Sequence, residues 1–240
     1  YDLAYRRRAV FPAYLAMGLP LLVVWYTKGV LYASLPPLAT TSLVDNPLLG
    51  ADCWTARVTA LGVIARYGWL LIWPAKLSCD YSYDQIPLAT WPFDGWAAGA
   101  ALAVLGAFAG ILLVAVRQRR ANRALAFFIG FSLVALLPTS NLIVLIGSIM
   151  AERFLYLPSV GFAACVAILV FAACSRLPVR RPRALAAGIL VVFVLAGCLR
   201  SVARNHDWRD DVRLWSSAVA ASPRSFKTHH GLAYALYQSD

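Results

Sequence analysis

The sequence predicts an all-α protein in which several helices cross a membrane and a short soluble helical segment follows. Of its 240 residues, 61% are hydrophobic and only 14% are charged, whereas a soluble domain carries about 25% charged residues. Apolar runs recur along the chain up to residue 199, and a polar stretch begins at Arg204. We therefore expect a polytopic membrane domain over residues 1–203 and a separate helical segment over 204–240.

The placement of arginine sets the expected topology. Arginines cluster in three short connectors between apolar runs, at residues 6–8, 117–123 and 176–183. Cytoplasmic loops are enriched in Lys and Arg, so these connectors are expected in the cytoplasm. The same placement accounts for the net charge of +11 without a nucleic-acid partner, because no soluble basic face presents it. The expected crossings number about five: 9–27, 96–116, 124–137, 155–175 and 184–199.

The apolar segment over residues 54–73 is expected not to cross. Thr55, Thr59, Gly62 and Arg66 recur at helical spacing and form one polar stripe. Such a stripe suits a helix that lies at the membrane interface or lines a cavity. The following connector, 75–95, contains three Asp and one Lys, and it lies outside only if 54–73 stays at the outer face.

A broken segment precedes the fourth expected crossing. Pro138 and the polar run Thr139-Ser140-Asn141 stop a helix, and residues 141–150 are too short to span a bilayer. We expect a second outer-face helix there, because broken helices at membrane depth persist only where they pack in protein or line a wet cavity. Glu152 and Arg153 follow, and an ionisable pair at the foot of a span is a candidate functional site.

Two sets of charged residues could carry chemistry. The forked donors of Arg153 suit a phosphate, with Glu152 setting their orientation; alternatively, the two form a local salt bridge that anchors the helix at the interface. Asp80 and Asp84 in the outer connector could act as a base or bind a divalent metal. The alternative is that they solvate or cap an exposed turn.

The end of the chain has the spacing of a tetratricopeptide repeat, with Trp215, Ala218 and Pro223 at its aromatic, small and closing positions. An ordinary helical hairpin is the alternative. One and a half repeats cannot form a stable solenoid, so we expect more repeats beyond residue 240. Since the chain also opens on Tyr1, we interpret it as an internal fragment. A disulfide between Cys53 and Cys79, both in outer connectors, is left open.

Several stretches together resemble the transmembrane-and-tetratricopeptide-repeat (TMTC) family of protein O-mannosyltransferases and its bacterial relatives. In chain order, the matching stretches are Asn46-Pro47; Leu77-Ser78-Cys79-Asp80-Tyr81-Ser82 with Ile86-Pro87; Leu137-Pro138-Thr139-Ser140-Asn141-Leu142; Ala151-Glu152-Arg153-Phe154-Leu155-Tyr156-Leu157-Pro158-Ser159 with Gly161-Phe162; Arg204-Asn205 with Asp207-Trp208; and Leu214-Trp215.

The resemblance implies a GT-C glycosyltransferase fold, of which this chain would supply the C-terminal half of the membrane domain and the first repeat. It implies transfer of a sugar, mannose in this family, from a polyprenyl-phosphate donor to Ser or Thr hydroxyls of protein acceptors. The family's acidic catalytic motif lies in the first external loop and matches no position here, so no catalytic residue is assigned. No cofactor is assigned either, and a divalent metal is left open.

Within this interpretation each candidate residue receives a role. We assign the donor phosphate to Arg153, Glu152 and Arg66, and loop or acceptor contacts to Asp80, Asp84, Tyr156 and Asn141. Abundant Arg and Ala suggest a bacterial source, hence an inner-membrane protein with periplasmic repeats; an endoplasmic reticulum membrane with lumenal repeats is the alternative. Two rival functions stay open: a non-enzymatic anchor that presents repeats to protein partners, and a carrier of lipid-linked saccharides.

Overall fold

The computed structural model describes residues 42–89 and 95–239, together with Leu19, Leu22, Val23, Tyr26, Thr27 and Val30. The chain forms two compact units, Tyr1–Ser42 and Leu43–Asp240, and the second is described here. Apart from the six positions just named, which are helical, the predicted span 9–27 and the arginine cluster at 6–8 lie outside the described residues. The described residues contain helices and no strand, so the predicted all-α class is confirmed.

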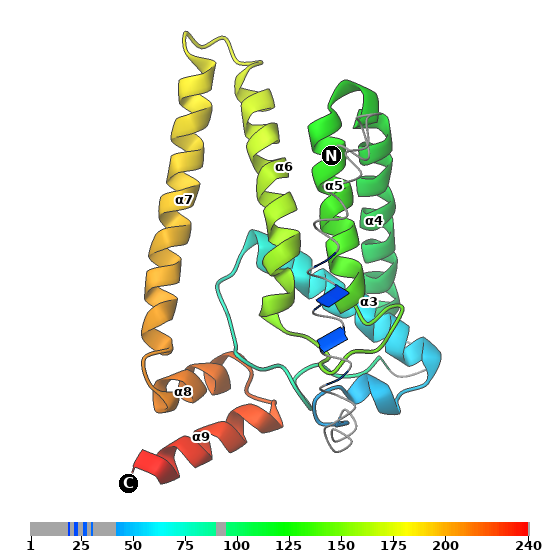
Figure 1. The fold of residues 1–240 in the computed structure, drawn as a ribbon, viewed down its shortest axis with the longest axis vertical. Coiled ribbons are helices and arrows are strands. Elements are labelled where there is room, and N and C mark those ends of the chain that lie inside the picture. Colours follow the sequence, from blue (N-terminus) through cyan, green and yellow to red (C-terminus); the bar gives the residue numbers. More distant parts are fainter. Residues whose placement is uncertain are drawn as a thin grey trace. The chain divides into compact units, whose positions relative to one another are not determined.

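Four helices that follow one another in the chain form an apolar bundle in this unit (Figure 1): α4 (Gly95–Ala121), α5 (Arg123–Leu136), α6 (Tyr156–Cys174) and α7 (Pro182–Asp207). Each packs against the next in the chain. Three stretches of the described residues are long and apolar enough to cross a membrane, Ala98–Ala121, Glu152–Cys174 and Pro182–Asp207. Helix α5 is shorter, about 21 Å at 1.5 Å per residue, against a hydrocarbon core of about 30 Å.

Local sequence explains where these helices begin and how closely they pack. The side chain of Asn122 caps α5 by accepting from Leu125 N, 3.0 Å away. Gly161 lets α6 approach α5, because a Cβ there would lie 2.2 Å from Ser132 Oγ. The Ser132 hydroxyl donates to the carbonyl of Pro158 across the same contact, at 3.1 Å. Close helix approach at a small residue is typical of membrane bundles.

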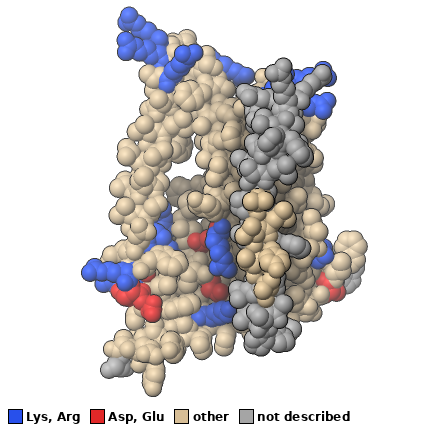
Figure 2. All heavy atoms as spheres, viewed as in Figure 1, with Lys and Arg blue, Asp and Glu red and all other residues tan. Residues whose placement is uncertain are grey.

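Charge separates the two ends of the helices. The arginine clusters at 117–123 and 176–183 lie at the α4–α5 and α6–α7 turns, which meet the same end of the molecule (Figures 1 and 2). The Asp and Glu side chains visible in Figure 2 lie toward the other end, where further Lys and Arg side chains are also visible. This distribution agrees with the expectation that both turns face the cytoplasm.

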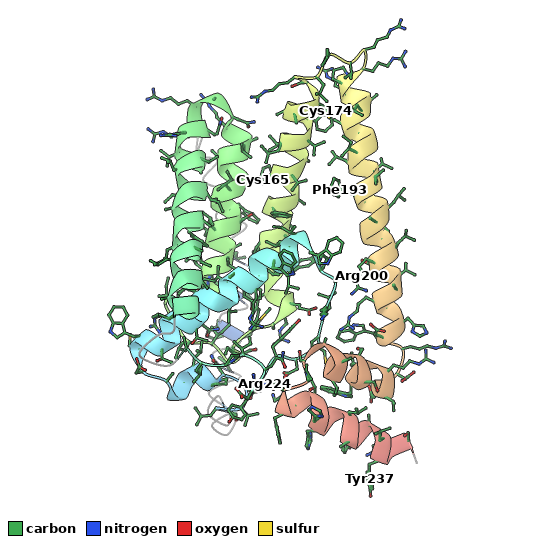
Figure 3. The ribbon with its side chains drawn as sticks, turned by 180° about the vertical axis from the view of Figure 1, so that it is seen from behind. Cys165, Cys174, Phe193, Arg200, Arg224 and Tyr237 are labelled. Carbon is green, nitrogen blue, oxygen red and sulfur yellow. The ribbon has the colours of Figure 1, made fainter. Side chains whose placement is uncertain are left out.

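Helix α3 (Cys53–Ile72) lies across the end of the bundle opposite the arginine turns (Figures 1 and 3). It begins at the N-cap Asp52, whose carboxylate accepts from Trp54 N and Thr55 N. Here α3 and the loops around it form a core cluster of buried side chains: Leu48, Ala56, Val63, Tyr67, Tyr81, Ile86, Ile149, Met150 and Leu155. The polar end of the bundle is therefore held by packing outside the long helices.

Two expectations about the chain's irregular parts need correction. Residues 141–150 form an irregular loop between the 3-10 turns η2 (Leu137–Thr139) and η3 (Glu152–Leu155) rather than an outer-face helix. The backbone of this loop is bound by asparagine side chains and not by its own helical ladder. Helix α7 continues through Asp207, so the expected boundary at residue 204 falls inside it.

The chain ends in a hairpin of α8 (Asp211–Ala221) and α9 (Phe226–Ser239). Trp215 of α8 packs directly on Gly231 of α9, where a Cβ would lie 2.3 Å from the indole ring. Arg204, near the end of α7, joins Asp207 at 2.8 Å and donates to Ser217 Oγ of α8 at 3.1 Å. These contacts fix both the hairpin and the angle at which it leaves α7.

The charge distribution predicts a labelling pattern for single cysteines in a cysteine-free background. Cysteines at Arg120 and Arg181 should resist an impermeant maleimide added from outside, whereas cysteines at Tyr83 and Tyr237 should react. All four positions are exposed in the structure, so protection reports the membrane and not burial. Labelling of sealed and permeabilised membranes by gel shift is the measurement. Reaction of Tyr237→Cys only after permeabilisation would contradict the topology.

Candidate functional site

Two buried asparagines join loops that are 95 residues apart in the chain. Asn46 Nδ2 donates to Ile146 O at 2.6 Å and to Asn141 Oδ1 at 3.2 Å. Asn141 Oδ1 also accepts from Ile146 N, and its Nδ2 donates to the carbonyls of Ser148 and Ile149. Asn141 adopts a φ of 57°, a left-handed conformation that Asn tolerates better than most residues. Its amide is therefore occupied in holding the 141–150 loop.

A buried tyrosine on α3 fixes the next part of that loop. The hydroxyl of Tyr67 accepts from Ala151 N at 3.0 Å, and the side chain is only 1% exposed. Burial raises the pKa of Tyr67 to about 12, partly offset by its bond to the Ala151 carbonyl and by the charge of Arg153. Tyr67 thus stays neutral at physiological pH and places residues 151–153 against α3.

The carboxylate of Glu152 organises the connector that follows α3. Its Oε1 accepts from the Tyr81 hydroxyl and from Ser78 N, both at 2.6 Å. Burial raises the pKa of Tyr81, and its hydrogen bond to Glu152 raises it further. Both donors belong to the 74–89 connector, so one acidic side chain at the foot of α6 holds a loop 71 to 74 residues earlier in the chain.

Other elements complete the attachment of the connector. Arg200 of α7, labelled in Figure 3, donates to the carbonyls of Pro74 and Ala75 at 3.1 and 2.6 Å. At the far end, Thr59 Oγ1 of α3 accepts from Ala89 N at 2.9 Å. The connector is therefore an ordered structure and not a flexible loop between helices.

An apolar groove of about 950 Å³ opens between the helices. It is lined almost entirely by apolar side chains of α3, α4, α5 and α6, among them Gly68, Val104, Gly110, Leu133 and Phe162. A groove of this kind can bury an extended hydrocarbon chain, which gains about 0.8 kcal/mol for each CH₂ removed from water.

A second pocket, of about 660 Å³, lies on the connector side of α3 and has a different character. Its lining includes two cations, Arg66 and Lys76, together with the polar side chains of Tyr81 and Gln85. Trp69, Leu70, Trp73, Ala75, Met150 and Ala221 complete it. Ala65 lines both cavities, so an apolar groove and a cationic pocket adjoin at α3.

The predicted site residues fall into separate environments. Arg66 lines the cationic pocket. Arg153 is exposed, and its guanidinium carbon lies 5.3 Å from the centroid of the Phe154 ring. Among the described residues, Glu152 is bound by Ser78 and Tyr81 instead of setting the orientation of Arg153. Tyr156 is 80% exposed at the start of α6.

Asp80 and Asp84 bind different partners. Asp80 Oδ1 accepts from Ser82 N at 2.8 Å and from Ser225 Oγ at 2.9 Å, and Asp84 pairs with Arg224 at 2.7 Å. No group of three His, Cys, Asp or Glu side chains that could hold a metal occurs in the part of the chain that the structure describes. The thiols of Cys53 and Cys79 are both free.

Sequence reasoning missed Lys76, Gln85 and the Ser225 turn. Lys76 is the one cation of an otherwise acidic connector, a signal that could have been used. Ser225 and Gln85 carry no such signal, because their partners are remote in sequence.

The three apolar helices long enough to span a bilayer indicate a polytopic membrane protein. The family model described as "Protein O-mannosyl-transferase TMTC, DUF1736" matches residues 36–108, which include α3 and the connector. Protein O-mannosyl-transferase TMTC4 of Homo sapiens is 31% identical over 210 residues, covering 86% of this chain and 28% of the relative. Protein O-mannosyl-transferase Tmtc3 of Drosophila melanogaster is 29% identical over 209 residues, covering 87% and 22%.

These matches identify the chain as a homologue of the TMTC protein O-mannosyl-transferases, which confirms the resemblance seen in the sequence. The chain spans about a quarter of the length of these curated relatives, 28% and 22%. No solved structure matches.

The Glu152 arrangement predicts the effect of removing one hydroxyl. Tyr81→Phe should lower the free energy of unfolding by about 1.5–3 kcal/mol, the value of a hydrogen bond to a charged group. Equilibrium unfolding in detergent micelles is the measurement. Tyr83→Phe is the matched control, because Tyr83 is 54% exposed whereas Tyr81 is 8% exposed. Equal stability of the two variants would show that the Tyr81–Glu152 bond does not hold the connector.

Proposed function

We propose that this chain is part of a membrane mannosyltransferase of the GT-C class, which transfers mannose from a polyprenyl-phosphate donor to Ser or Thr hydroxyls of proteins. The observation that carries the proposal is the junction of the apolar groove and the cationic pocket at Ala65. The names of the TMTC relatives support the transferase class and the protein acceptor.

A polyprenyl-phosphate donor has two parts that match the two cavities. Its isoprenoid chain is long and apolar, and it would occupy the groove between α3, α4, α5 and α6. Its phosphate is anionic and would sit beside Arg66 and Lys76. Because α3 lies at the end of the bundle, the junction would fall where lipid headgroups meet hydrocarbon.

The cations would serve binding and chemistry together. During transfer, negative charge grows on the departing lipid phosphate, and cations in a partly dry site stabilise that charge more than they would in water. Arg153 would supply a further cation, because it is exposed at the foot of α6, next to Glu152, which binds the connector. A general base must take the proton of the acceptor hydroxyl, and we assign it to no residue here.

The proposed acceptor side is the face that carries the α8–α9 hairpin. We interpret the hairpin as a first tetratricopeptide repeat on the periplasmic or lumenal side. The exposed Tyr156 at the start of α6 is available to an acceptor. Asp80, Asp84 and Asn141 would act indirectly, because their side chains are bound within the protein.

Filling the groove should impair use of long-chain donors. Gly68 lines the groove, and a Cβ there would meet nothing within 4 Å, so the side chain of Gly68→Leu begins in open space and extends into the groove. It should raise the KM for a long polyprenyl-phosphate mannose about tenfold, the loss of one to two buried CH₂ contacts, with little change for a short-chain donor. Transfer to a Ser/Thr acceptor by purified full-length protein is the assay.

Gly62→Leu is the control, because Gly62 lies on the same helix with the same free space but outside the groove. Equal effects of the two substitutions would argue against a lipid-binding groove. Absence of transfer by the wild-type protein would leave the anchor or carrier functions.

Replacing Arg153 should affect the transfer step itself. Arg153→Ala is expected to lower kcat about a hundredfold, or about 3 kcal/mol, through loss of a charge that stabilises the leaving group. Arg153→Lys should recover part of this, since lysine keeps the charge and loses the fork. Arg209→Ala, an exposed arginine after α7, is the control. Wild-type turnover by a well-folded Arg153→Ala protein would assign the arginine to membrane anchoring.

A further inference from the structure

The terminal hairpin forms part of the cationic pocket. Ala221, the last residue of α8, lies in the pocket lining together with Arg66 and Lys76. The wall that Ala221 contributes comes from the soluble segment, whereas most of the pocket comes from α3 and the connector. The pocket is therefore complete only when the hairpin rests in this position.

The turn between α8 and α9 is buried and held by its own hydrogen bonds. Ser222, Ser225 and Thr228 are each 0% exposed. The Thr228 hydroxyl lies 3.1 Å from the carbonyl of Ser222 and 2.9 Å from that of Ser225. Ser225 N also donates to the Ser222 carbonyl. These bonds hold the turn in the conformation that contacts the connector.

That turn is bonded to the connector at several points. Ser225 Oγ donates to Asp80 Oδ1 at 2.9 Å and lies 3.0 Å from Ser82 Oγ. Asp84 N donates to the carbonyl of Arg224 at 2.9 Å, and the two side chains form an ion pair. A second ion pair, between Lys227 and Asp45, reaches the loop before α3. The turn thus contacts both loops that flank α3.

One of these bonds leads directly into the pocket. Arg224 N donates to Gln85 Oε1 at 3.0 Å, and Gln85 lines the pocket. The backbone of the turn therefore sets the side-chain orientation of a pocket residue. Arg224, labelled in Figure 3, lies at this junction of the hairpin and the connector.

We propose that the α8–α9 hairpin is a docked wall of the cationic pocket, and that Ser225 and Arg224 are positioning residues for the binding of an anionic lipid headgroup there. The identity of the headgroup rests on the proposed function, whereas the docking of the hairpin rests on the contacts described above. The repeat surface is then held at a fixed place beside the donor instead of swinging on a linker. An acceptor bound by the repeats would be presented to the pocket in one orientation.

The contacts between the turn and the connector are expected to contribute unequally to docking of the hairpin. The Arg224–Asp84 pair is exposed, 58% and 42% for its two side chains, and exposed ion pairs contribute little. The Ser225 hydroxyl is buried and donates to a carboxylate, a stronger class of hydrogen bond. Ser225 is consequently the position at which to break the docking.

The test uses full-length protein in nanodiscs and Ser225→Ala, with Ser239→Ala in the same hairpin as control. Hydrogen exchange of peptides covering 80–86 and 222–228 reports docking, and equilibrium binding of a radiolabelled polyprenyl monophosphate reports the pocket. Ser225→Ala should speed exchange in both peptides and weaken binding about tenfold, and Ser239→Ala should do neither. Asp80→Asn keeps an oxygen that can accept both bonds but removes the charge, so it should show the same two changes as Ser225→Ala, each to a smaller extent.

Two results of the exchange and binding measurements would overturn the proposal. Faster exchange with unchanged binding would show that the hairpin is docked but is no wall of the pocket, and unchanged exchange would show that Ser225 does not hold it; either overturns the inference. Should Ser225→Ala fail to fold, Arg224→Ala is measured in its place, with an expected two- to threefold loss of binding, about the value of an exposed ion pair. If the wild-type protein binds the polyprenyl monophosphate but does not transfer mannose, the proposed function is wrong and the docking proposal is unaffected.

Discussion

The structure depends on satisfying the backbone of one connector at the membrane surface. Residues 74–89 have no helix or strand of their own, so their N–H and C=O groups need partners from elsewhere. Glu152 is the central partner of the connector, since its Oε1 accepts from both Ser78 N and the Tyr81 hydroxyl. A charged acceptor at a half-buried position is tolerated because two donors meet it. Without it, the connector would lose its attachment to α6.

Partners for the rest of the connector come from elements far apart in sequence. Arg200 of α7 holds its beginning, Ser225 of the hairpin turn holds its middle at Asp80, and Thr59 of α3 holds its end. Two of these partners are remote in sequence: Arg200 lies 126 residues from Pro74, and Ser225 lies 145 residues from Asp80.

The sequence predicts the fold class well because hydrocarbon composition and arginine placement are properties of single segments. It fails where the deciding contact is remote. The 141–150 segment looks like a short apolar helix, but it forms an irregular loop whose backbone is bound at Ile146 by Asn46, 100 residues earlier. Glu152 and Arg153 look like a local pair, yet the carboxylate faces Ser78 and Tyr81. No local pattern indicates that Arg224 N meets Gln85, 139 residues away.

Helix α3 explains why two unlike cavities adjoin. At 20 residues it is long enough to cross a bilayer, but its buried residues pack on the connector and the 141–150 loop, which holds it across the end of the bundle. Around Ala65, successive residues then face different surroundings: Ile64 and Tyr67 line the apolar groove, and Arg66 lines the cationic pocket. A crossing helix would present both faces to lipid. Lying across the end, α3 separates hydrocarbon from charge within one helical turn, and an amphipathic ligand can therefore contact both.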